Sequence, residues 1–236
     1  MITSKNKLLI GGVVVVALVL LGAGAWYYHA KVQVAAFPLH AGEQVSSWEF
    51  KGAYSGNDTL ITQANADIQK LTDLLGKGQY DDYDLHIGMG NDYALMGNGA
   101  KAFEEYNKAI HIHQEKGLAY TNVANLFNQL GLYESAADAY TKAVSVEGGT
   151  LEYHLERLNY LTRQFPTDNA RILAAFTDAS TQFGDNASIL AIEAQWLTGQ
   201  GKYAEAIKAW QRAKLLSPGR DTSAMDAEIA RLQKKL

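Results

Sequence analysis

The feature that most constrains the fold of this 236-residue chain is a helical hairpin pattern at residues 117–148. Its first half places apolar side chains at i, i+3, i+4 and i+7, which is typical of a helix with one buried face. Its second half has a similar stripe in which alanine predominates, and Gly131 separates the two halves. The stripes consist of Tyr120, Val123, Ala124 and Phe127, and of Ala136, Ala139, Tyr140 and Ala143. Residues 117–148 are therefore expected to form two short helices joined by a tight turn.

The landmarks of this hairpin recur elsewhere in the chain at fixed intervals. Counting back 34 residues from Phe127, Gly131, Ala136, Tyr140 and Ala143 gives Tyr93, Gly97, Ala102, Tyr106 and Ala109. Counting forward 70 residues gives Leu197, Gly201, Ala206, Trp210 and Ala213. Because one hairpin cannot bury both of its faces alone, this recurrence predicts a stack of hairpins.

A degenerate hairpin occupies the interval of 70 residues. Leucines form its first stripe, and Pro166 with Thr167 and Asp168 provides a helix stop and a new cap between the two helices. Its stripes consist of Leu151, Leu155, Leu158 and Leu161, and of Ile172, Ala175, Phe176 and Ala179. The sequence thus predicts four hairpins, at 83–116, 117–150, 151–186 and 187–220.

One further helix is expected at each end of the stack, because the terminal faces of a solenoid need a solvated cover. Residues 58–82 are predicted to form an N-terminal packing helix and turn, and residues 221–236 a C-terminal capping helix. Their apolar stripes consist of Ile61, Ala64, Ile68, Leu71 and Leu75, and of Met225, Ile229, Leu232 and Leu236. The predicted fold class is all-α.

The spacing of the landmarks resembles the tetratricopeptide repeat. That family has a small residue at position 8, a large apolar one at position 11, alanine at positions 20 and 27, an aromatic residue at position 24 and proline at position 32. Three of the four hairpins match at all but the last position, where only Pro218 keeps the proline. The resemblance covers residues 83–220. It implies a right-handed α-solenoid of about four hairpins, whose first helices line a concave face.

The N-terminal segment has the composition of a membrane anchor. Lys5 and Lys7 precede the run 8–28, which contains no charged or amide side chain and ends in aromatic residues. As a helix, 21 residues extend about 31 Å, which matches a bilayer core of about 30 Å. The sequence predicts a tail at 1–7 and a transmembrane helix in the lipid bilayer at 8–28. The alternative is a cleaved signal peptide, for which Ala23-Gly24-Ala25 provides a cleavage motif.

The positions of the lysines also predict the topology. Two lysines and the amino terminus precede the apolar run, and only Lys31 follows it closely, which favours a cytoplasmic N-terminus. The expected protein is a single-pass membrane protein with extracytoplasmic repeats, on the periplasmic or outer face of a bacterial inner membrane. Residues 29–57 are predicted to form a tether, and we expect Trp48 and Phe50 within it to dock on the first repeat rather than bind a partner.

Composition and motifs exclude most kinds of chemistry. The chain has no cysteine, so it contains no disulfide or thiolate metal site. A net charge of −4 and the absence of a basic run argue against nucleic acid. Gly88-Met89-Gly90 lacks the third glycine of a nucleotide-binding loop, and Asp81, Asp82 and Asp84 are expected to cap a helix rather than bind calcium. No catalytic residue, cofactor or metal site is predicted.

The candidate binding surface is the concave face implied by the resemblance. Position 9 carries an amide in every hairpin, and amides can pair with the backbone of an extended peptide. The alternative is a structural role for these amides, which are frequent at this position of the family. Two glutamates stand where chaperone-binding repeats have cations, so a neutral or basic peptide is favoured. The candidate groove residues are Asn91, Thr121, Asn122, Asn125, Asn128, Glu152, Glu156, Asn159 and Gln195.

These expectations combine into one functional hypothesis and two alternatives. The hypothesis is a membrane-anchored, non-catalytic adaptor that binds protein partners or peptide segments within a membrane or cell-envelope assembly. The first alternative is a periplasmic chaperone that holds exported polypeptides. The second is an enzyme of unrecognised class, for which the carboxylates of residues 81–84 are the place to look. The oligomeric state stays open.

Overall fold

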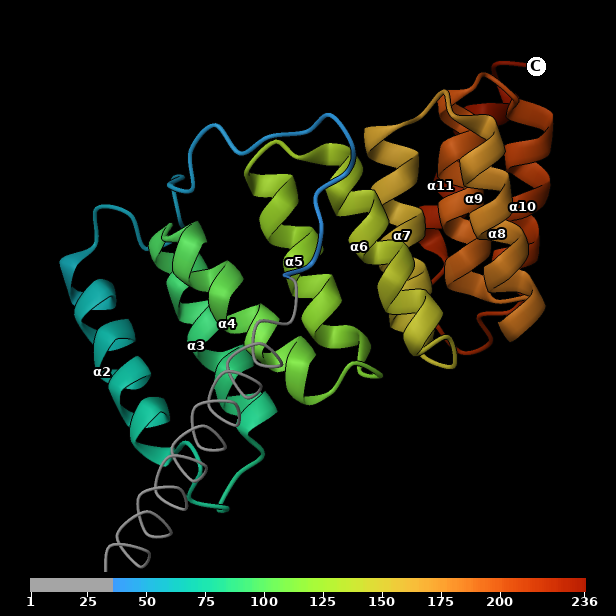
Figure 1. The fold of residues 1–236 in the computed structure, drawn as a ribbon. Coiled ribbons are helices and arrows are strands. Elements are labelled where there is room, and N and C mark those ends of the chain that lie inside the picture. Colours follow the sequence, from blue (N-terminus) through green and yellow to red (C-terminus); the bar gives the residue numbers. More distant parts are fainter. Residues whose placement is uncertain (1–35) are drawn as a thin grey trace, which may run out of the picture. The chain divides into compact units, whose positions relative to one another are not determined.

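Ten α-helices follow one another in the part of the chain that the structure, a computed structural model, describes, which is residues 36–236 (Figure 1). No β-strand interrupts them in this range. The helices are α2 (Asp58–Leu74), α3 (Asp82–Met96), α4 (Gly99–Ile112), α5 (Gly117–Gln129), α6 (Tyr133–Val146), α7 (Leu151–Gln164), α8 (Asn169–Phe183), α9 (Ala187–Gly199), α10 (Tyr203–Leu215) and α11 (Ser223–Gln233). The predicted tail 1–7 and transmembrane helix 8–28 lie outside the described residues. Between residues 36 and 236, no helix combines the length and apolarity that a bilayer span requires.

The helices pair and stack in the order that the sequence repeats predict. Helices α3 and α4, α5 and α6, α7 and α8, and α9 and α10 form four successive hairpins. The first three hairpins pack on one another through α4 and α5 and through α6 and α7, and the third packs on the fourth through α7 and α8 against α9. Helix α2 packs on α3 and helix α11 on α10, so each end of the stack carries one extra helix (Figure 1). The prediction of an all-helical solenoid is confirmed.

A glycine shapes the turn inside three of the hairpins. Gly97, Gly131 and Gly201 have φ angles of 84°, 77° and 73°, which side chains with a Cβ rarely adopt. The third hairpin has no glycine at this register. Its second helix instead begins at a side-chain cap, in which the Asp168 carboxylate accepts a hydrogen bond of 3.1 Å from the Arg171 N–H. The degenerate hairpin therefore turns by different local chemistry.

Small residues allow the helices of each hairpin to approach closely. The alanines at positions 20 and 27 are completely buried in the three well-matched hairpins. They are Ala102, Ala136 and Ala206, and Ala109, Ala143 and Ala213. At position 8 of the first hairpin even an alanine is too large, because a Cβ on Gly90 would lie 2.4 Å from the Tyr106 ring. The bulky residue at position 24 thus fills the space that small neighbours leave.

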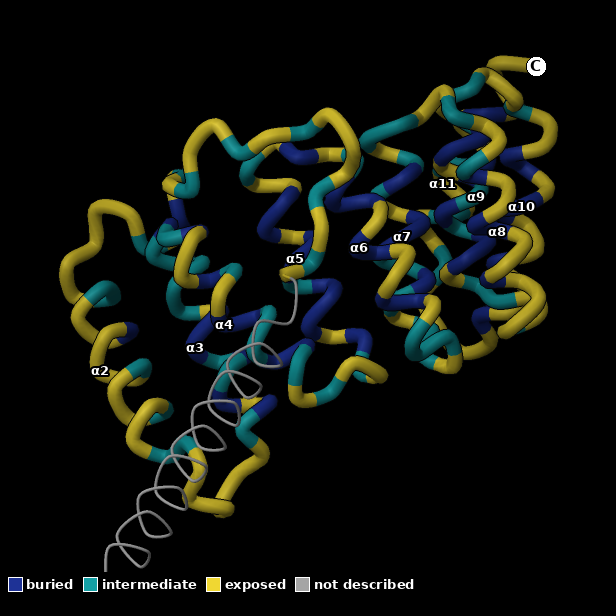
Figure 2. The backbone as a smooth tube through the Cα atoms, in the orientation of Figure 1, coloured by how far each residue is buried: buried dark blue, intermediate teal, exposed yellow. Residues whose placement is uncertain are grey.

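The buried side chains form two clusters along the stack. One joins the first two hairpins, and the other joins the last two and helix α11. Tyr160 packs against both clusters, and its ring lies 4.9 Å from that of Tyr140. Helix α2 contributes only Ala64 as a fully buried residue and is otherwise mostly exposed (Figure 2). Helix α2 therefore buries fewer residues than any other helix of the described part.

Residues 37–54, called the strap below, lie across the first two hairpins (Figure 1). Trp48 stacks on Phe103 of α4 with ring centroids 5.1 Å apart, and Phe50 packs on the same core cluster. The predicted docking of these two aromatic residues on the first repeat is confirmed. The apolar side chains of the strap that reach this cluster are Phe37, Leu39, Val45 and Phe50. The strap is therefore part of the core and not only a connection.

Backbone hydrogen bonds hold the C-terminal half of the strap at the turn between α3 and α4. The Trp48 carbonyl accepts a bond of 2.8 Å from the Gly99 N–H, and the Phe50 N–H donates one of 3.2 Å to the Gly97 carbonyl. The Tyr54 N–H donates a bond of 2.8 Å to the carbonyl of Leu95. These bonds satisfy backbone groups at the end of α3 and the start of α4 that the helices themselves leave unpaired.

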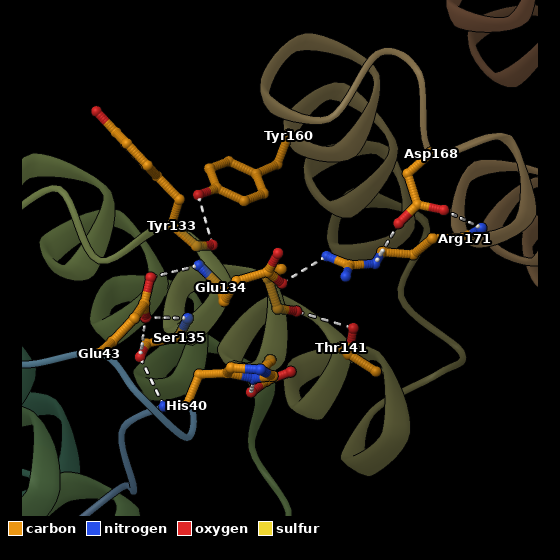
Figure 3. Close-up of polar contacts among 11 residues, drawn as sticks. His40, Glu43, Tyr133, Glu134, Ser135, Thr141, Tyr160, Asp168 and Arg171 are labelled. Carbon is orange, nitrogen blue, oxygen red and sulfur yellow. Dashed lines mark hydrogen bonds and ion pairs between the residues drawn. The ribbon is translucent and has the colours of Figure 1, made fainter.

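Glu43 of the strap caps helix α6 from a distant point in the sequence (Figure 3). Leu132 at the N-cap position offers no side-chain acceptor. The Glu43 carboxylate accepts hydrogen bonds from the N–H groups of Glu134 at 3.0 Å and Ser135 at 2.8 Å, and from the Ser135 hydroxyl. A carboxylate at this place also meets the positive end of the helix dipole. Nearby, His40 Nδ1 lies 2.7 Å from the Asp138 carboxylate, and the two side chains form an ion pair when His40 is protonated.

Glu43→Gln should lower the free energy of unfolding by roughly 1–2 kcal/mol at pH 7, because it removes the charge from these hydrogen bonds. Burial alone would raise the pKa of Glu43, but the bonds from Ser135 and Glu134 hold it below the ordinary value. A depressed pKa stabilises the fold above the unfolded-state pKa, about 4.3, and this stability is lost as the pH falls through the folded-state pKa.

Urea unfolding at pH 7 and at several lower values measures this effect. The difference between the native protein and Glu43→Gln should shrink as the pH falls below about 4.3. Glu49→Gln is the matched control, since Glu49 is an exposed carboxylate of the same strap. A difference that stays constant down to pH 3 would exclude a capping role for the ionised carboxylate.

Candidate functional site

Three pockets follow one another along the first helices of the hairpins. The α2–α3 pocket has a volume of about 550 Å³, the α3–α5 pocket about 390 Å³ and the α5–α7 pocket about 280 Å³. Asn91 lines both the first and the second pocket, and Asn125 lines both the second and the third. Each pocket is therefore adjacent to the next at one of these two amides, and together the three pockets are called the groove below.

The character of the groove changes along its length. The α2–α3 pocket is mainly apolar and is lined by Asp67, Lys70, Leu71, Leu74, Tyr80, Leu85, Gly88, Asn91 and Asp92. The α3–α5 pocket is lined by Asn91, Ala94, Leu95, Tyr106, Asn122, Asn125, Leu126 and Gln129. The α5–α7 pocket is mainly polar and is lined by Asn125, Asn128, Tyr140, Glu156, Asn159, Tyr160, Arg163 and Gln164. A ligand along the groove thus meets an apolar end and a polar end.

The position-9 amides of the first two hairpins have a structural hydrogen bond. The Tyr106 hydroxyl donates to Asn91 Oδ1 at 2.9 Å, and the Tyr140 hydroxyl donates to Asn125 Oδ1 at 2.6 Å. Each bond joins the second helix of a hairpin to its first helix. Since the bond occupies the amide oxygen, it leaves the amide N–H₂ group available to a ligand in the groove. The structural and the binding interpretations of these two residues are therefore compatible.

The other two position-9 amides lack such a partner. Position 24 is Ala174 in the third hairpin and Trp210 in the fourth. Within residues 36–236, neither the Asn159 nor the Gln195 side chain forms a hydrogen bond. Asn159 lines the α5–α7 pocket, whereas Gln195 on α9 lies outside the three pockets. The amide column of the sequence is thus a groove feature in its first three members.

The remaining predicted groove residues divide into lining and non-lining positions. Asn122, Asn128 and Glu156 line the groove. Thr121 is buried below it, with 3% of its surface exposed, and Glu152 is an exposed residue at the start of α7 outside the pockets. The lining residues that the sequence analysis missed include Arg163, Tyr160 and the apolar wall of α2. Continuing the helical register of the third hairpin by one turn beyond Asn159 would have found Arg163.

Three buried polar atoms beside the groove have no hydrogen-bond partner within residues 36–236. They are Thr121 Oγ1, Asn122 Nδ2 and Glu156 Oε2. An unpaired buried polar atom costs about 1–3 kcal/mol, so a fold retains it more readily where a bound group can pair with it. Two of the three belong to residues that line the groove.

The groove carries more negative than positive charge. Burial raises the pKa of Glu156, the Thr121 hydroxyl beside the carboxylate opposes this rise, and the nearby Glu152 adds to it. Burial likewise raises the pKa of Asp92, with Asp67 as the second cause. Within residues 36–236, neither Glu156 nor Asp92 has a cationic partner, whereas Asp67 pairs with Lys70 at 2.8 Å. Both unpaired carboxylates would be stabilised by a cation.

The acidic residues before α3 have structural partners. Asp81 caps α3 by accepting a bond of 3.0 Å from the Tyr83 N–H, as the sequence predicted. Its carboxylate also lies 3.0 Å from the His113 ring and 3.1 Å from the Lys116 ammonium group. No group of three or more histidine, aspartate or glutamate side chains in the range 36–236 is placed to hold a metal ion.

Comparisons with known proteins connect this chain to others only through its fold. No protein-family model and no curated protein sequence matches it. Among solved structures, BtubC (BKLC) from P. vanneervenii superimposes with a TM-score of 0.59 and 15% identity, over 77% of this chain and 84% of BtubC. MamA superimposes with a TM-score of 0.51 and 15% identity, over 72% of this chain and 96% of MamA.

A chain of the APC/C hetero-tetramer Cut9-Hcn1 is also similar, with a TM-score of 0.52 and 17% identity. The match covers 75% of this chain and 35% of that chain. At these identities the likeness concerns the fold alone, and all three neighbours are tetratricopeptide-repeat proteins. Together with the repeat landmarks and the four stacked hairpins, they show that the described part of this chain has the fold of the tetratricopeptide-repeat family.

Proposed function

We propose that this protein is a non-catalytic scaffold that binds partner proteins through the groove. The observation that carries the proposal is the row of three adjacent pockets that share Asn91 and Asn125. Adjacent pockets in a row suit an extended segment, whereas a single pocket suits one group. The amide side chains offer donors and acceptors that suit a peptide backbone.

The carboxylates that an enzyme hypothesis would use are better explained as structural groups. Asp81 caps α3 and lies against the His113 ring and the Lys116 ammonium group. A general acid or base needs a carboxyl group that is free to exchange a proton with a substrate. This arrangement supports the scaffold in preference to an enzyme that uses residues 81–84.

The cellular setting of the proposal rests on the sequence. A transmembrane helix at 8–28 would attach the protein to a bilayer, and the lysines before it would place the repeats outside the cytoplasm. We therefore place the scaffold in a membrane or cell-envelope assembly, with the repeats on the periplasmic or outer face. Cleavage after a signal peptide would give the same compartment without attachment.

Crosslinking and affinity capture of the full-length protein from its native membranes tests the function. The groove variant is Asn128→Ala with Asn159→Ala, because both amides line the α5–α7 pocket, are exposed and form no side-chain hydrogen bond with the described residues. The matched control is Gln182→Ala with Gln211→Ala, two exposed amides on second helices. A defined set of partners should be lost with the groove variant and retained with the control.

Two outcomes contradict the proposal. Equal capture by the groove variant and the control would remove the groove as the binding surface. Recovery of many unrelated exported polypeptides, with no defined set, would instead support the chaperone alternative. Both variants should have the same urea unfolding midpoint as the native protein, since neither changes a buried contact.

A further inference from the structure

The groove combines three features that restrict the chemistry of its ligand. Its α2–α3 end is apolar, its middle offers amide groups, and two of its carboxylates have no cationic partner among residues 36–236. Each feature selects one property of a peptide. The inference below rests on the proposed function and specifies the ligand of the same groove.

The apolar end has room for one large side chain. Leu71, Leu74 and Leu85 form its walls, and Tyr80, which is 61% exposed, stands at its rim. Gly88 allows Leu71 of α2 to approach α3 closely, because a Cβ at residue 88 would lie 2.9 Å from Leu71 Cδ1. Helix α2 buries only Ala64, so its leucines at this wall stay partly exposed. The pocket suits a leucine-sized or aromatic side chain.

The two unpaired carboxylates lie in different pockets of the groove. Asp92 lines the α2–α3 pocket itself, and Glu156 lines the α5–α7 pocket at the other end of the groove. Helix α5 lies between the helices that carry them. The two carboxylates therefore lie in the first and the last pocket of the groove, and a segment that meets both must extend along the groove.

The amides lie between the two carboxylates. Asn91 and Asn125 keep their N–H₂ groups available, because tyrosine hydroxyls occupy their oxygens. Asn122 Nδ2 is buried beside them without a partner in the described range. These donors match the carbonyl groups of an extended backbone.

We propose that the groove binds an extended segment of a partner protein in which an apolar residue is followed or preceded by a basic residue, with a second basic residue farther along the segment. The apolar side chain occupies the α2–α3 pocket, and the basic residues face Asp92 and Glu156. The backbone between them pairs with the amides of Asn91, Asn122 and Asn125. Pairing removes the cost of two carboxylates that burial leaves without a counter-charge.

Fluorescence anisotropy with the purified full-length protein and designed peptides tests the proposal. The first probe has nine residues, with leucine first, lysine at the second and eighth positions and alternating serine and glycine elsewhere. The second probe is its reversed sequence, since the structure sets no direction. At least one should bind, and a peptide with glutamates in place of the lysines should bind at least tenfold more weakly.

Variants assign each end of the peptide. Glu156→Gln and Asp92→Asn should each weaken the lysine peptide about tenfold, and the exposed control Glu205→Gln should not. Tyr80→Ala should weaken it several-fold and should have no effect on a peptide that lacks the leucine. Because Tyr80 is largely exposed, this variant is expected to fold normally. Equal binding of the lysine and glutamate peptides would overturn the proposed charge pattern.

The ligand and the groove can fail separately. If neither lysine peptide binds while capture of native partners still depends on Asn128 and Asn159, the ligand chemistry is wrong and the groove remains the binding surface. If the variant with Asn128→Ala and Asn159→Ala also captures the same partners as the native protein, the proposed function fails as well. If Tyr80→Ala binds the leucine peptide as tightly as the native protein does, the apolar anchor is wrong.

Discussion

Phe127→Ala should lower the free energy of unfolding by about 3–5 kcal/mol, the largest effect expected in this protein. Phe127 is completely buried at the end of helix α5. Its ring lies 5.4 Å from the Phe103 ring of α4 and 6.2 Å from the Phe37 ring of the strap. Truncation therefore opens a cavity where both hairpins and the strap meet, and the surrounding helices cannot all move to fill it.

Urea unfolding followed by circular dichroism at 222 nm measures this loss. Leu215→Ala is the control, because Leu215 is 81% exposed and its truncation should change stability by less than about 0.5 kcal/mol. A loss below 1 kcal/mol for Phe127→Ala would mean that this ring is not at the centre of the packing. A double variant with Phe37→Ala should lose less than the sum of the two single losses, because the rings share one contact.

Gly52→Ala should cost roughly 2–3 kcal/mol, because it forces the strap away from the first hairpin. A Cβ at residue 52 would lie 2.3 Å from the Leu95 carbonyl oxygen and 2.4 Å from the Gly97 nitrogen. Both are backbone atoms at the turn between α3 and α4, so no side-chain rotation relieves the clash. The hydrogen bonds of the Phe50 and Tyr54 N–H groups, which lie on either side, should break together.

Stability and proteolysis together test this expectation. Gly149→Ala is the control, because a Cβ at residue 149 meets no atom within 4 Å. Release of the strap should also increase the rate of tryptic cleavage after Lys51, which lies next to Gly52 and is exposed. An unchanged unfolding midpoint with an unchanged cleavage rate would show that the strap does not pack on the backbone of the first hairpin.

Both substitutions test the packing of the strap on the first two hairpins. Phe127 is the core residue of the hairpins on which the strap packs, and Gly52 is the strap residue that closely contacts the backbone of the first hairpin. If both substitutions destabilise as expected, the strap is a structural part of the first two hairpins. A partner that binds the groove then binds a surface whose first two hairpins the strap holds together.

The helical hairpins were predictable because their signals are local. An apolar stripe at helical spacing, a glycine such as Gly131 and a buried alanine such as Ala136 act within one hairpin of about 34 residues. The repetition of these signals also predicts which hairpins are neighbours. The degenerate third hairpin was identified for the same reason, since Asp168 provides a local cap in place of the glycine.

The contacts of the strap could not be predicted from any local sequence pattern. Glu43 caps a helix more than 90 residues farther along the chain, and the Phe37 N–H donates to Asn107 from 70 residues away. The strap has no regular period, so nothing in its sequence specifies which surface it will meet. The docking of Trp48 and Phe50 was expected because large aromatic residues favour burial, whereas the capping role of Glu43 was not.

The groove was predictable from the sequence only in part. The sequence alone determined the fold class, the register of the hairpins and the amide column at Asn91, Asn125 and Asn159, because helical period and turn chemistry act over a few residues. Only the tertiary structure decided that tyrosines bind two of these amides, that α2 adds an apolar pocket and that Glu156 is left without a cation. Those facts depend on the distances between helices, which arise from packing and are not encoded in any single segment.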